Sequence, residues 1–165
     1  MGVSGSGKST VSAALAQELG LPFVDADNLH PATNVAKMAA GRALTDADRM
    51  PWLDHVGAAL VSSRDSGMVM ACSALKRRYR EAILTAASAT QFVFLDASQE
   101  LLENRLRQRR GHFMPPALLS SQLIALERLD SDEPGITVII DEYPQLKGLV
   151  TAICGRLAVA PKADS

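Results

Sequence analysis

Aromatic residues and cysteine are scarce in this chain of 165 residues, which has four Phe, two Tyr, one Trp and two Cys. The two cysteines, Cys72 and Cys154, are too few for a disulfide framework and favour a reduced, cytoplasmic setting. No apolar run reaches the roughly 20 residues that a transmembrane helix needs, so we expect no membrane contact. The formal net charge of −1 lacks the basic excess of non-specific nucleic-acid binders, so we expect no nucleic-acid partner. The length fits one domain over residues 1–165, with a tail at about 158–165.

The strongest motif stands at the start of the chain. Residues 2–9 read Gly-Val-Ser-Gly-Ser-Gly-Lys-Ser and fit G-x-x-x-x-G-K-[ST], the phosphate-binding P-loop. Its glycines let backbone N–H groups converge on phosphate oxygens, Lys8 reaches the β- and γ-phosphates, and the Ser9 hydroxyl suits Mg²⁺. A helix expected over residues 8–19 points its positive N-terminus at the same phosphates. The motif predicts that ATP binds at Gly2, Val3, Ser4, Gly5, Ser6, Gly7, Lys8, Ser9 and Thr10, with Lys8 also catalytic.

Apolar runs alternate with helical segments after this loop. Strands are expected at residues 22–24, 68–72, 92–95 and 136–140. Helices are expected at about 31–40, 52–63, 98–110, 116–129 and 145–157. Thr45-x-x-Asp48 resembles a capping box, but we expect Pro51 to start the helix of residues 52–63. The alternation predicts an α/β fold with a doubly wound parallel sheet.

The strand that normally precedes a P-loop is not visible, because only Met1 comes before Gly2. Its absence would leave neighbouring strands with unpaired backbone groups, at about 1–3 kcal/mol for each buried group. We therefore expect the natural protein to begin upstream, with about five to ten more residues rich in Val, Ile or Leu. The alternative is that the chain is complete and another segment fills the gap.

Two carboxylates follow the first expected strand, in Asp25-Ala26-Asp27. Residues two apart share a face if the strand continues to Asp27, and ligands of open α/β sheets bind at the carboxyl ends of strands. A solvated turn is the alternative, but next to a P-loop the pair favours a functional role. We expect Asp27 to contact an accepting hydroxyl and Asp25 to lie nearer to Mg²⁺.

Basic residues cluster in two further segments. Lys76 and Arg80 are four residues apart, and on one helical face they favour a bound anion, the alternative being a solvated basic helix. The arginines at 105, 107, 109 and 110 precede Gly111, as in a mobile lid of about 105–116 over polyphosphate. We expect Arg105, Arg109 and Arg110 to bind ATP, with Arg109 favoured for catalysis. Trp52 is more often a core residue than a ligand contact.

A P-loop alone does not fix the reaction. The Asn-Lys-x-Asp that reads guanine in GTPase switches is absent, which leaves adenylate-kinase-like enzymes and small-molecule kinases. Carboxylates after a strand and an arginine-rich lid favour phosphoryl transfer to a bound hydroxyl.

Longer segments make the chain resemble the gluconokinase family of P-loop small-molecule kinases, which are nucleoside-monophosphate-kinase-like, and more distantly the shikimate kinases. The resemblance covers nearly the whole chain, and no Gly-Gly-Gly stretch of the shikimate kinases is present. It rests on residues 25–31 (Asp-Ala-Asp-Asn-Leu-His-Pro), 44–53, 72–80 (Cys-Ser-Ala-Leu-Lys-Arg-Arg-Tyr-Arg), 110–113 and 121–123 (Ser-Gln-Leu).

The resemblance implies phosphorylation of D-gluconate to 6-phospho-D-gluconate, with ATP and Mg²⁺, in cytoplasmic carbohydrate metabolism. Members of the family are commonly homodimers. The anionic substrate agrees with Lys76 and Arg80 facing its carboxylate, and His30 and Arg49 are weaker candidates for its hydroxyls. Shikimate or another small hydroxy acid is the alternative substrate, and a nucleotide-binding regulator without catalysis is the alternative function.

Overall fold

The computed structural model describes residues 1–108 and 116–159. Arg109 and Arg110, most of the predicted lid and residues 160–165 of the predicted tail lie outside the described residues.

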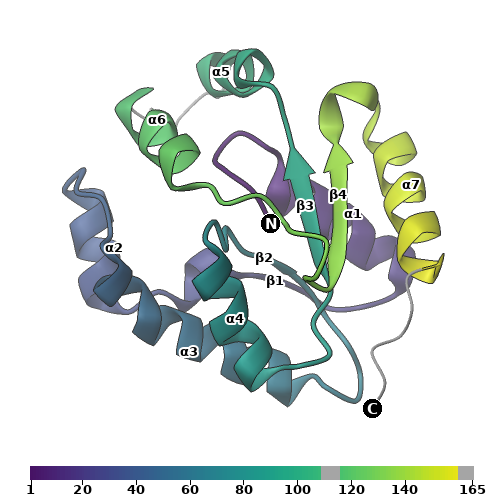
Figure 1. Cartoon of the computed structure of the whole chain (residues 1–165), viewed down its shortest axis with the longest axis horizontal. Coiled ribbons are helices and arrows are strands. Elements are labelled where there is room, and N and C mark those ends of the chain that lie inside the picture. Colours follow the sequence, from purple (N-terminus) through teal and green to yellow (C-terminus); the bar gives the residue numbers. More distant parts are fainter. Residues whose placement is uncertain (109–115, 160–165) are drawn as a thin grey trace.

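Helices and strands alternate along the chain, as the sequence predicts (Figure 1). The strands are β1 (Phe23–Asp25), β2 (Val69–Ala71), β3 (Phe92–Asp96) and β4 (Gly135–Ile139). The helices are α1 (Lys8–Leu19), η1 (Ala26–Leu29), α2 (Ala32–Ala39), α3 (Asp46–Ser62), α4 (Arg77–Ala86), α5 (Gln99–Gln108), α6 (Pro116–Ala125), η2 (Ile140–Glu142) and α7 (Leu146–Val159).

Both strand pairings are parallel, which confirms the predicted α/β class. β1 pairs with β2, and β3 pairs with β4, so the described strands form two parallel pairs. Met1 and Gly2 lie between the pairs: the Met1 carbonyl accepts from the Leu95 N–H at 3.0 Å, and the Gly2 N–H donates to the Ser73 carbonyl at 3.2 Å. A cavity of about 410 Å³ adjoins Met1 and touches β2 and β3. The strand expected upstream of Met1 stays a prediction.

Two groups of helices cover these strands. α1 packs on α7 and on β2, and α3 packs on α4 (Figure 1). The core between α3 and α4 contains the fully buried Trp52, Val56 and Ile83. A second core, which contains Val138 and Ile153, joins α1 and α7 to β3 and β4. These two cores hold the strands in place, and the loops that follow the strands form the site described below.

Helix α3 begins five residues before the predicted start at Pro51, because its capping box determines the first turn. The Asp48 N–H donates to Oγ1 of Thr45 at 3.2 Å, and the Thr45 N–H donates to Oδ2 of Asp48 at 2.7 Å. Pro51 therefore lies inside the helix, where its ring costs one backbone hydrogen bond. The earlier start places Asp46 and Arg49 in the first turn of α3.

Candidate active site

The P-loop leads into α1 through two left-handed glycines. Gly5 has φ 86° and Gly7 has φ 87°, conformations that residues with a side chain rarely adopt. A Cβ at Gly5 would also lie 3.2 Å from the Leu102 carbonyl oxygen. Gly7 caps α1 without a side-chain hydrogen bond, and the positive end of the helix dipole at this turn suits an anion. The local backbone thus has the form of a phosphate cradle.

Three side chains hold the backbone of this loop, one from the loop itself and two from distant parts of the chain. Nζ of Lys8 donates to the Val3 carbonyl at 3.2 Å, and Nη1 of Arg105 donates to the Ser6 carbonyl at 3.3 Å. The Ser4 N–H donates to Oε1 of Gln122 at 2.7 Å, so α6 contacts the loop directly. The predicted link between Arg105 and the nucleotide site agrees with this position. No role was assigned to Gln122 from the sequence, although the Ser-Gln-Leu segment in which it lies marked the resemblance.

The two aspartates take different positions at the end of β1. Oγ of Ser9 donates to Oδ2 of Asp25 at 2.6 Å, which ties this carboxylate to the first turn of α1. Asp27 lies in η1 with its N–H 3.1 Å from Oδ1 of Asp25, and it is exposed. The strand does not continue to Asp27, which was the condition for a shared face, because the Asp25 carboxylate accepts from the Asp27 N–H and so caps η1.

The donors at Ser9 and Asp25 fit Mg²⁺. A hydroxyl and a carboxylate are hard oxygen ligands, and Mg²⁺ in kinases takes one or two protein carboxylates together with phosphates and water. Within residues 1–108 and 116–159, no group of three or more His, Cys, Asp or Glu side chains could hold a metal on its own. The pair therefore suits a metal that arrives with a nucleotide.

His30 and Trp52 stack with their ring centroids 4.4 Å apart. Trp52 is fully buried and donates its indole N–H to the Ala26 carbonyl at 2.7 Å, so it is a core residue. Burial lowers the pKa of His30, with nearby Asp27 raising it and Arg49 lowering it further. The ring is therefore neutral at pH 7, and its Nδ1 lies 3.3 Å from the Asn34 amide nitrogen. The charges of Asp27 and Arg49 thus both act on His30.

A second group of cations gathers around Tyr79. Nζ of Lys76 lies 5.8 Å and the Arg49 guanidinium 5.9 Å from the centroid of its ring. Lys76 also donates to Oδ1 of Asp46 at 3.0 Å, and Asp46 accepts from the Tyr79 hydroxyl and pairs with Arg78. Lys76 and Arg49 thus both lie next to the Tyr79 ring. No role was assigned to Asp46 from the sequence, although it lies within residues 44–53, which marked the resemblance.

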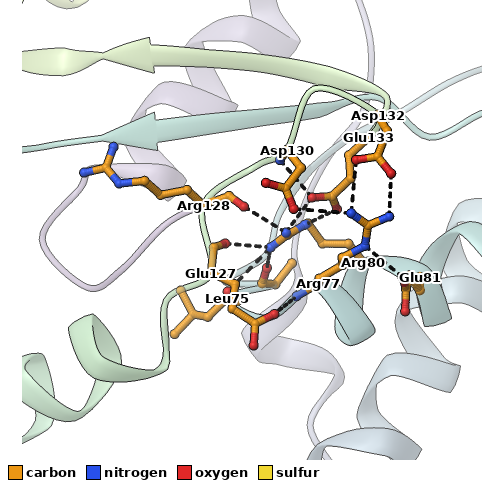
Figure 2. A network of polar contacts seen from close by, with 10 residues as sticks. Leu75, Arg77, Arg80, Glu81, Glu127, Arg128, Asp130, Asp132 and Glu133 are labelled. Atoms are coloured by element: carbon orange, nitrogen blue, oxygen red, sulfur yellow. Dashed lines mark hydrogen bonds and ion pairs between the residues drawn. The ribbon is translucent and has the colours of Figure 1, made fainter.

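Arg80 does not share a face with Lys76, because α4 begins at Arg77 and Lys76 is its extended N-cap residue. The Arg80 side chain is fully buried, and each of its three nitrogens donates. Nε and Nη2 bind the Glu133 carboxylate at 2.5 and 2.7 Å, and the remaining bonds go to backbone carbonyls (Figure 2). The structure does not support the predicted contact between Arg80 and a substrate carboxylate.

The turn between β2 and α4 contains a strained residue. Ala74 has φ 41° and is fully buried, and among the described residues no other non-glycine residue has a positive φ. The left-handed conformation costs an L-residue about 1–2 kcal/mol. Such strain persists where the surroundings determine it, and it gathers at functional sites.

Several known proteins are similar to this chain. Residues 1–129 match the family model described as an AAA domain. The chain is 47% identical to the gluconokinase of Gluconobacter oxydans, over 88% of this chain and 83% of that protein. It is 43% identical to the thermosensitive gluconokinase of Escherichia coli, over 84% of this chain and 75% of that protein.

Solved structures give the same result. A gluconokinase from Sinorhizobium meliloti superposes with a TM-score of 0.86 at 42% identity, covering 97% of this chain and 90% of that one. An unliganded sugar kinase from Janibacter superposes with a TM-score of 0.88 at 40% identity, covering 98% and 93%. The APS kinase of Mycobacterium tuberculosis, with a TM-score of 0.65 at 19% identity, shares the fold. With identities of this size over most of its length, the chain belongs to the gluconokinase family.

Proposed function

We propose that this chain transfers the γ-phosphoryl group of ATP to a hydroxyl of D-gluconate and forms 6-phospho-D-gluconate. The observation that carries the proposal is the Ser9–Asp25 hydrogen bond, because it fixes the aspartate segment against the phosphate loop. Relatives named gluconokinases, at 47% and 43% identity, support gluconate as the acceptor.

The nucleotide half of the site consists of the P-loop and the start of α1. Lys8 and the N–H groups of residues 5–9 neutralise and orient the phosphates. Ser9 and Asp25 would hold Mg²⁺, which supplies further neutralisation of phosphate charge when it is bound. Arg105 contacts the loop at Ser6, and we assign Arg109 and Arg110 to the γ-phosphate as the proposed lid.

The acceptor half of the site begins at Asp27. As the gluconate hydroxyl oxygen bonds to the γ-phosphorus, the bond from that phosphorus to the bridging oxygen breaks and the hydroxyl proton passes to the Asp27 carboxylate. The transition state is loose, so the carboxylate contributes as much by orienting the hydroxyl as by accepting its proton. Lys76 and Arg49 supply positive charge for the gluconate carboxylate, and neutral His30 donates to its hydroxyls.

We also propose a cellular location and an oligomeric state for this protein. None of the helices within residues 1–108 and 116–159 is long and apolar enough to cross a bilayer. Cys72 and Cys154 are both free thiols, which fits a reduced cytoplasm. We propose a homodimer, and light scattering of the purified protein measures its mass.

A screen of acceptors tests the proposed function. ADP release is measured with ATP, Mg²⁺ and, in turn, gluconate, shikimate, ribose and nucleoside monophosphates. Turnover that depends on gluconate supports the proposal. A preference for shikimate would identify another acceptor, and nucleotide binding without acceptor-dependent turnover would identify a regulator.

A further inference from the structure

Ala74 is held in its left-handed conformation by one group from the adjoining helix α4 and by two groups that lie far from it in the chain. The carbonyl of Ser73 accepts from the Gly2 N–H at 3.2 Å. The carbonyl of Ala74 accepts from Nη1 of Arg80 at 3.3 Å, and that of Leu75 accepts from the Glu127 N–H at 2.8 Å. Three successive carbonyls of one turn are therefore fixed from three separate places.

Arg80 is the centre of this arrangement. Its Nη1 also donates to the Glu127 carbonyl at 3.0 Å, and its Nη2 donates to the Arg128 carbonyl at 3.2 Å (Figure 2). The guanidinium thus joins the turn before α4 to the segment after α6, and Glu133 balances its charge. Because Arg80 pairs with Glu133, the pKa of that buried carboxyl is lowered.

Glu127, in the segment after α6, binds the backbone of the same turn at two places. Its carboxylate accepts from the Arg77 N–H at 2.6 Å and so caps the start of α4, where Lys76 provides no side-chain cap. Lys76 stands between the Leu75 carbonyl and the Arg77 N–H, and both of these groups are bonded to Glu127. The backbone on either side of Lys76 is therefore immobilised.

A buried ion pair contributes little net stability compared with apolar residues of the same volume, so a stability role alone does not account for it. From these contacts we propose that Arg80, with Glu133, is a positioning residue that holds the strained turn at Ala74 and thereby sets Lys76 toward the acceptor carboxylate. The inference rests on the proposed function, since it assigns Lys76 to that carboxylate. It replaces the direct contact that sequence reasoning gave to Arg80.

Arg80→Lys is the first test. Lysine keeps the charge beside Glu133 but has one nitrogen in place of three, so it cannot also bind the turn and the segment after α6. We expect KM for gluconate to rise about tenfold and KM for ATP to stay within about twofold. Arg77→Met is the matched control: its side chain binds exposed Asp132 at 2.7 Å and touches no carbonyl of the turn, so both KM values should hold.

The second test removes both charges with Arg80→Met and Glu133→Leu together, which leaves no unpaired buried charge. We expect a folded protein with raised KM for gluconate, and no further rise when Lys76→Met is added to it. A folded variant with unchanged KM, or additive losses in the triple variant, would overturn the inference. Failure of both Arg80 variants to fold would also overturn it, because the pair would then serve the fold itself.

The single variant Lys76→Met separates the two claims. If it leaves KM for gluconate unchanged, the role proposed for Lys76 is wrong. If the unaltered protein shows no turnover with gluconate, the proposed function is wrong. If the unaltered protein turns over gluconate, Lys76→Met raises KM for gluconate and Arg80→Lys behaves like the unaltered protein, only the positioning inference is wrong.

Discussion

The hydroxyl of Ser9 and the carboxylate of Asp25 are joined by a hydrogen bond of 2.6 Å. The bond connects the first turn of α1 to the end of β1, and these two residues are 16 positions apart in the chain. Since Asp25 also accepts from the Asp27 N–H, the position of the exposed Asp27 follows from the same contact. One short chain of polar contacts thus relates the phosphate loop to Asp27.

Asp27→Asn should lower kcat by about 10²-fold or more, the usual loss for a general base. Asparagine keeps the shape of the side chain but cannot take the proton of the accepting hydroxyl. Steady-state kinetics with gluconate measures the loss, and Asp54→Asn, an exposed aspartate on α3, is the control. An unchanged kcat with a raised KM would leave Asp27 only a binding role.

Alanine at Arg105, Arg109 and Arg110, one position at a time, tests the lid. An arginine that closes on the transferred phosphoryl group contributes about 10³–10⁵ to kcat, so at least one variant should lose activity on that scale. Arg107→Ala is the matched control, because this side chain on α5 instead donates to Asn104 at 2.8 Å. Three variants with near-normal kcat would remove the lid from the account.

The neutral state of His30 predicts that acid weakens the fold. Burial lowers the pKa of His30 in the folded protein, so below about 6.5 the unfolded chain binds the proton first. Stability should therefore fall between about pH 6.5 and the lowered pKa of the folded state. Urea unfolding at a series of pH values measures this, and His30→Gln should show a shallower decline over that window. Equal slopes for the two proteins would contradict the assignment.

Much of the fold follows from local sequence patterns. The expected helix at residues 8–19 is α1, and each of the four predicted apolar runs overlaps one of the four observed strands to within one residue at each end. The P-loop and Asp25 were also predictable, because a motif and a strand end identify them. Local patterns could not decide whether the capping box of Thr45 or Pro51 begins the helix. The structure shows that the capping box does, so α3 begins at Asp46.

The errors at the acceptor side have a different cause. Arg80 was expected to face a ligand because its spacing from Lys76 suits a helix, but its partner Glu133 lies 53 residues away. Only the tertiary structure brings that carboxylate to it. The same holds for Asp46, which pairs with Lys76 across 30 residues. Long-range ion pairs of this kind have no signature in a single sequence.

Direct identification of the product tests the central claim. The protein is incubated with ATP, Mg²⁺ and gluconate, and phosphorus NMR with mass spectrometry follows the fate of the γ-phosphoryl group. We predict that each ADP formed is matched by one phosphomonoester of gluconate. We also predict that Lys8→Ala, which removes the charge at the β- and γ-phosphates, remains folded and forms neither product. ADP without phosphogluconate, or near-normal turnover by Lys8→Ala, would contradict the account.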